Sequence, residues 1–242
     1  YAINKNWSLS AGKQIVGIGG YEYDLAPIDI YTLSEFCNNI SCYQFGASAS
    51  YALDNNKDLF TLQLCQSPFQ IEGNRDIYAL NFVWYGNRDC WNTIYSANLV
   101  EYLPHKFIGY LALGNQFKSG KTTFNIDLMG RTTGAQVKDG DLFKDFSIIG
   151  SITQEIGEHV ILRVNASHDV NKNKSAGDLC VLPGTEITNV GGGIEVFPAR
   201  TRDVRLHAYY SYYAGRNASG TLQPDDMQLS VGLTWRINFI KK

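Results

Sequence analysis

The feature that most constrains the fold of this 242-residue chain is a regular alternation of apolar and polar side chains. It is clearest at 227–239, where every second residue is Met, Leu, Val, Trp, Ile or Phe and those between are Gln, Ser, Gly, Thr, Arg and Asn. The same period of two runs through 43–53, 123–131 and 160–169. Because successive side chains of a β-strand point to opposite faces, this pattern predicts strands with one apolar face and one polar face.

Strand length separates two all-β architectures. We predict twelve strands, near 6–16, 42–53, 58–67, 77–86, 92–102, 106–117, 122–133, 144–155, 159–170, 187–197, 204–214 and 227–240. Most have about 10–14 residues, whereas globular strands usually have about 5–6 and a tilted bilayer-spanning strand needs about 9–11. A soluble sandwich would also bury bulky side chains between two sheets, but here the second face carries Gly, Ser, Thr, Asn and Gln. The pattern favours a transmembrane antiparallel β-barrel.

The connections and aromatic residues favour the same fold. Short and long links alternate along the chain, as the turns and loops of outer-membrane barrels do; the short link 103–106 is the exception on the long-loop side. Aromatic residues recur near strand ends, which is typical of the girdles at membrane interfaces. They are Trp7, Tyr43, Tyr51, Trp84, Phe107, Phe117, Trp235 and Phe239.

Composition excludes other classes of protein. Mean hydropathy is −0.19 and no window approaches the ~18 consecutive apolar residues of a spanning helix. A net charge of −2 gives no electrostatic support for nucleic-acid binding. The five cysteines form no CxxC and have no His at metal-ligand spacing, so we predict no metal and no cofactor. Cys37 and Cys42 are near enough in sequence to pair, or both remain thiols.

Four blocks carry a resemblance to a known family: 7–14 (WSLSAGKQ), 19–36 (GGYEYDLAPIDIYTLSEF), 110–131 and 229–239. Together they resemble porins of Bacteroidetes outer membranes that are similar to the phosphate-selective porins O and P. The resemblance implies a homotrimer of barrels with about sixteen strands each, embedded in lipid and lipopolysaccharide, with a long loop folded into the lumen. Residues 1–242 would then hold about twelve of those strands, with about four before Tyr1, unless this is a smaller relative.

Residues 17–41 form the most informative link. They contain four acidic residues, Glu22, Asp24, Asp29 and Glu35, and no Lys or Arg occurs between Gln14 and Asn56. We predict a short helix after Pro27 and a loop that folds inward to constrict the lumen. The alternative is a loop that packs on a neighbouring subunit or across the barrel mouth.

Alternation also predicts which charged side chains line the pore, where their field would bias ion passage. The inward basic candidates are Arg131, Arg163, Arg205 and Arg236, together with His207; the inward acidic candidates are Glu101, Asp127, Glu155, Asp169 and Glu195. Glu195 and Arg205 lie on one hairpin, so the alternative is that they pair and neutralise each other rather than act on solutes.

These features predict a porin of the bacterial outer membrane for passive diffusion of small polar or ionic solutes, with anions such as phosphate among the candidates. The alternative is a non-conducting structural or receptor barrel of a surface complex. A twelve-stranded phospholipase would need Ser and His together on the outer surface; His168 has the outward parity, but Ser147 and Ser167 have the inward parity. We therefore predict that the protein is not an enzyme.

Overall fold

The structure is a computed structural model that describes residues 1–25, 29–54, 57–69, 76–140, 144–172, 180–199, 202–218 and 225–236. Its strands are β1 (Trp7–Ile15), β2 (Tyr43–Ala52), β3 (Asp58–Gln66), β4 (Tyr78–Arg88), β5 (Trp91–Leu103), β6 (Lys106–Ser119), β7 (Thr122–Thr133), β8 (Asp145–Ile156), β9 (Val160–Asn171), β10 (Glu186–Val196), β11 (Val204–Arg216) and β12 (Met227–Trp235). Two short helices, α1 (Glu35–Asn39) and α2 (Gly134–Asp139), lie in connections. No helix in these ranges is long and apolar enough to cross a membrane.

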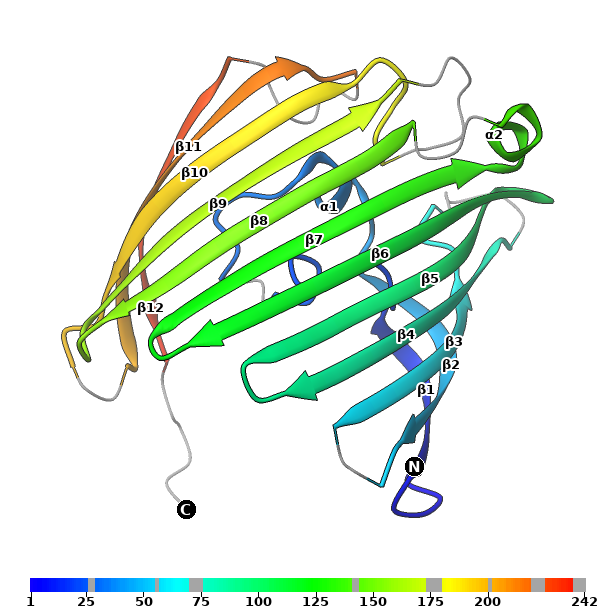
Figure 1. Cartoon of the computed structure of the whole chain (residues 1–242), viewed down its shortest axis with the longest axis horizontal. Helices are drawn as coiled ribbons and strands as arrows, with labels where there is room; N and C mark the ends of the chain where they lie inside the picture. The colour runs from blue at the N-terminus through cyan, green and yellow to red at the C-terminus, as the bar shows by residue number, and fades with distance from the viewer. Residues whose placement is uncertain are drawn as a thin grey trace.

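The twelve strands form one antiparallel sheet in which every strand pairs with its neighbours in the chain. This confirms the predicted strand count and the all-β fold; the last part of the predicted final strand, 237–240, lies outside the described residues. The sheet curls around the β1–β2 connection, which Figure 1 shows in blue within its concave side. Strands β1 and β12 are the two edges, and no pairing between them occurs in the described ranges.

The links alternate in length, as predicted. Tight turns at one end of the sheet have backbone conformations with positive φ, at Asp89 (50°), Gly120 (57°), Gly157 (65°) and Arg202 (55°). The opposite end carries the long connections and the tight exception at 103–106, where His105 has φ 63°. Helix α2 begins in one long connection with a capping box formed by Thr133 and Gln136.

The convex face of the sheet is an apolar belt. Leu62, Leu111 and Ile148 are 53%, 44% and 44% exposed, and each lies at the outward parity of its strand. At the tight-turn end, the rings of Trp91, Phe117 and Phe124 stack across three neighbouring strands with centroid separations of 6.2 and 6.3 Å. Exposed aromatics also follow the other end, namely Tyr43, Tyr78, Phe107 and Tyr212. Large exposed apolar surface with aromatic borders matches a lipid environment.

Candidate functional site

Residues 16–42, which we call the inner segment, leave β1 and run along the concave face before they enter β2 (Figure 1). The predicted helix is present but starts late, because Ser34 caps α1 by accepting a hydrogen bond from the Cys37 backbone N–H at 3.2 Å. Residues 26–28, which include Pro27, lie outside the described ranges. All five cysteines are free: Cys37 is buried and Cys42 is exposed, so the suggested Cys37–Cys42 pair is not formed.

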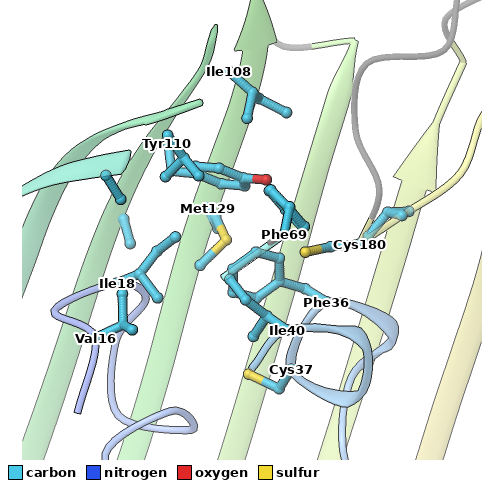
Figure 2. Close-up of a cluster of buried hydrophobic side chains, with 14 of the residues drawn as sticks. Val16, Ile18, Phe36, Cys37, Ile40, Phe69, Ile108, Tyr110, Met129 and Cys180 are labelled. Carbon is cyan, nitrogen blue, oxygen red and sulfur yellow. The ribbon is translucent and has the colours of Figure 1, made fainter. Parts of the chain in front are cut away.

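Apolar packing holds the middle of the inner segment against the wall. Phe36 is 0% exposed and lies 5.6 Å from the ring of Tyr110 on β6 (Figure 2). The cluster is completed by Val16, Ile18, Cys37 and Ile40 of the segment, Cys65, Ala79, Val100, Ile108, Ala112 and Met129 of the wall, and Phe69, Ile77, Cys180 and Val181 of other links. Alternation predicted an inward face that is polar throughout, but this part of the inward face is apolar and covered by the segment.

Amide side chains on three adjacent strands bind the start of the segment. Asn98 donates to the Gly17 carbonyl at 2.5 Å and to Asn81 Oδ1 at 3.0 Å. Asn81 in turn donates to Gln63 Oε1 at 2.9 Å, the same atom that accepts the Gly17 N–H at 2.9 Å. Gln63 also donates to the Ile15 carbonyl at 2.8 Å. These inward amides satisfy the buried backbone of the segment, and charge-based sequence reasoning missed them.

Asp127 on β7 anchors the first turn of the segment. Its Oδ2 accepts the Glu22 backbone N–H at 2.8 Å. A Cβ on Gly20 would lie only 2.4 Å from Asp127 Oδ1, so a glycine is needed for this close approach. The Glu22 carboxylate accepts hydrogen bonds from the Ser34 N–H and hydroxyl, at 2.8 and 2.5 Å. Burial raises the pKa of Glu22 to about 7, although the hydrogen bonds from Cys37 and Ser34 oppose the rise.

A second carboxylate of the wall supports α1. Asp169 Oδ2 accepts the Glu35 backbone N–H at 2.8 Å, and Asp169 Oδ1 accepts a hydrogen bond from Ser147. Beside them, Arg131 is 0% exposed and forms an ion pair with Asp145 at 2.6 Å. Arg131 also donates to Ser147 Oγ at 2.7 Å. The structure therefore encloses Arg131 in a buried polar network.

Two further arginines form a network with the inner segment. Arg163 Nε lies 2.8 Å from Glu195 Oε1, and Arg205 Nη1 lies 2.6 Å from Asp29 Oδ1 and 3.5 Å from Glu195 Oε1. The Tyr31 hydroxyl donates a hydrogen bond to the same Glu195 oxygen at 2.7 Å. The predicted Glu195–Arg205 pairing is thus present, and the acidic Asp29 joins it from the segment.

An aromatic stack continues from this network. The ring of Tyr31 lies parallel to Tyr209 at 5.0 Å and is tilted against His207 at 4.9 Å. Tyr209 covers the glycines of β10, where a Cβ on Gly191 would be 2.6 Å from its hydroxyl oxygen and one on Gly193 would be 2.5 Å from its ring. The glycine run in β10 makes room for this ring.

Two cavities flank the inner segment. The first, of about 60 Å³, lies toward β7–β9 and β11; Glu22, Asp29, Asp127 and Arg163 line it among other residues. The second, of about 100 Å³, lies toward β4 and β5, and Asp24 is among its lining residues.

The other predicted pore residues lie apart from these cavities. Arg236 is exposed just beyond β12. Glu155 pairs with Arg202 at 3.1 Å near a tight turn, and Glu101 accepts the His105 N–H at 2.6 Å at the opposite end. Within the described ranges, no three His, Cys, Asp or Glu side chains are grouped so that they would hold a metal ion.

Comparison with known proteins places the fold among outer-membrane barrels. No protein-family model and no curated protein matches the sequence. Outer-membrane expressed OmpT of Vibrio cholerae matches with a TM-score of 0.59 at 12% identity, over 95% of this chain and 75% of that one. In-vitro folded OmpT in its trimer form matches with 0.55 at 12% identity, over 95% and 74%.

A BenF-like porin from Pseudomonas fluorescens Pf-5 matches with a TM-score of 0.50 at 12% identity, over 95% of this chain and 63% of that one. At this level of identity the likenesses show the fold. The chain is an all-β protein with the antiparallel sheet of the outer-membrane β-barrels.

Proposed function

We propose that this protein is a porin of the bacterial outer membrane, through which small polar or ionic solutes diffuse past the inner segment. One observation carries the proposal: the convex face is apolar and exposed, while the concave face holds polar side chains and a segment of chain. A polar concave face that encloses a segment of the chain does not fit a soluble sandwich, in which the inner faces of two sheets pack on each other. The BenF-like porin among the structural matches supports the proposal.

The inner segment is the proposed constriction. It is fastened to strands far apart in the sheet, to β5 through Asn98, to β7 through Asp127 and to β11 through Arg205. A segment attached across the concave face narrows the passage without closing the sheet, and solutes would pass it by size. The homotrimer and the contacts with lipid and lipopolysaccharide belong to the same proposal, which the trimer form of OmpT supports.

The resemblance to phosphate-selective porins is carried over only as far as the diffusion role. Selective passage of anions would need arginines whose charge is available to solutes. Arg163 and Arg205 instead bind the carboxylates of Glu195 and Asp29. A catalytic role is not part of the proposal, since His168 bonds to the Thr188 hydroxyl at 2.9 Å whereas Ser147 and Ser167 are buried on the other face.

A specific observation favours a second candidate, the non-conducting structural or receptor barrel. The apolar cluster around Phe36 fills part of the interior. Planar-bilayer recording of the purified, folded protein separates the two candidates. Stepwise conductance in a preparation that shifts on a gel after heating supports the porin, and steps in groups of three support the trimer. Silence from the same heat-modifiable preparation would overturn the porin and leave the structural barrel.

A further inference from the structure

The arginines of the concave face have their charges balanced locally. Arg131 is paired with Asp145, Arg163 with Glu195, and Arg205 with both Asp29 and Glu195. Opposite charges this close cancel at longer range, since the field of a pair decays faster than that of a single charge and salt screens what remains. These arginines therefore attract passing anions only weakly.

Three carboxylates in or next to the inner segment differ from these arginines, because among the described residues their charges are not balanced by a neighbouring charge of opposite sign. In the part of the chain that the structure describes, Glu22, Asp24 and Asp127 have no Lys, Arg or His within ion-pair distance. Glu22 and Asp127 are bonded to uncharged groups, the Ser34 hydroxyl and N–H and the Glu22 N–H respectively. Hydrogen bonds of this kind favour the carboxylate form without cancelling its charge.

Both cavities beside the segment carry this excess of negative charge. The first is lined by Glu22 and Asp127, whose charges no basic side chain in the described ranges balances. The other charged residues of its described lining, Asp29 and Arg163, are already paired, with Arg205 and Glu195 respectively. The described lining of the second includes Asp24 and no basic side chain. Arg236 lines neither cavity.

We infer that the passage beside the inner segment favours cations over anions, and that Asp24 is one of the residues that set this preference. The inference rests on the proposed porin function and adds the sign of the charge that passes more readily. Confined space with low-dielectric walls strengthens the field of fixed charges, so a small net charge at a constriction biases the ions that traverse it. Asp24 is exposed, so its charge reaches the solvent in the passage.

The test is the reversal potential of the folded protein in a planar bilayer with a potassium chloride gradient at pH 8. Potassium and chloride have similar mobilities in water, so the sign of the reversal potential reports the ion preference of the protein. We expect potassium to permeate in excess of chloride. One charge acting through water over several ångströms changes the local ion concentration by about two- to threefold, so Asp24→Asn should lower the potassium-to-chloride permeability ratio by about that factor.

A matched control removes a carboxylate far from the interior. Asp54 lies in a turn, paired with Lys5, and its side chain is 75% exposed. Asp54→Asn should leave the permeability ratio of the wild type unchanged.

The outcomes separate the two proposals. A channel that conducts but prefers chloride, or shows no preference, would overturn this inference and leave the porin function intact. The same holds if the wild type prefers potassium but Asp24→Asn and Asp54→Asn change the permeability ratio equally. A folded protein that does not conduct would overturn the porin and this inference with it.

Discussion

The attachment of the inner segment is most directly tested by Phe36→Ala. The Phe36 ring is completely buried, contacts Tyr110 and lies 5.7 Å below the guanidinium of Arg131. Replacing a buried Phe by Ala costs about 3–5 kcal/mol. Phe36 belongs to the segment and to no strand, so the loss falls on docking of the segment rather than on the β ladders.

That loss lowers the ratio of docked to undocked segment by about two to three and a half orders of magnitude, at 1.4 kcal/mol per factor of ten. Two measurements report it. Single-channel conductance should rise, because an undocked segment leaves a wider passage. Chymotrypsin should cleave after aromatic residues of the inner segment, a suitable protease because no Lys or Arg for trypsin occurs between residues 14 and 56.

Phe82→Ala is the matched control, because Phe82 lies on the convex face and is 43% exposed. It should leave conductance and cleavage of the inner segment as in the wild type. Phe36→Leu, which keeps most of the buried volume, should fall between wild type and Phe36→Ala and serves if the alanine variant does not fold. Phe36 variants that fold, conduct and resist chymotrypsin like the wild type would refute the packing argument.

Three further predictions concern the polar groups. Arg131→Ala removes the guanidinium that pairs with the buried Asp145 carboxylate, so it should destabilise the protein by about 3–5 kcal/mol in urea titrations followed by gel shift. The double variant Arg131→Met with Asp145→Leu should recover most of that loss. Equal stability of the single and double variants would contradict this. Burial raises the pKa of Glu22 to about 7, so acidification from pH 8 to 5.5 protonates this carboxylate and removes a negative charge. The potassium preference of the wild type should therefore fall over this range, and Glu22→Gln should show a weaker pH dependence. Identical pH profiles for the two proteins would contradict the role of the Glu22 charge. Gly20→Ala places a Cβ 2.4 Å from Asp127 Oδ1, so the turn must shift and the conductance should change; unchanged conductance would show that this contact does not position the segment.

Much of the architecture was predictable because alternation is a local property. The order of residues within each strand shows which side chains point to each face of the sheet. The length of the strands then indicates a membrane barrel without knowledge of any tertiary contact. The Glu195–Arg205 pair was also within reach, since hairpin neighbours are set by turn position. The acidic character of residues 17–41 and their short helix were visible for the same reason.

The contacts of the inner segment were not predictable, because they join residues far apart in the chain. Asn98 and Gly17 are separated by 81 positions and Arg205 and Asp29 by 176. Inward parity alone does not show whether a polar side chain meets water or a buried backbone group. Parity therefore predicted Arg131 as a pore-lining residue, whereas its guanidinium is enclosed with Asp145 and Ser147.

The sequence by itself determined the strands, their order and which face of the sheet is apolar, because these depend on neighbours within a few residues or one hairpin. Only the tertiary structure decided how the concave face is used. There, curvature of the sheet brings distant strands around one segment, and the buried amide, carboxylate and guanidinium groups form hydrogen bonds because leaving them unpaired costs free energy. The balance of charge left over after that pairing is a property of the folded chain alone.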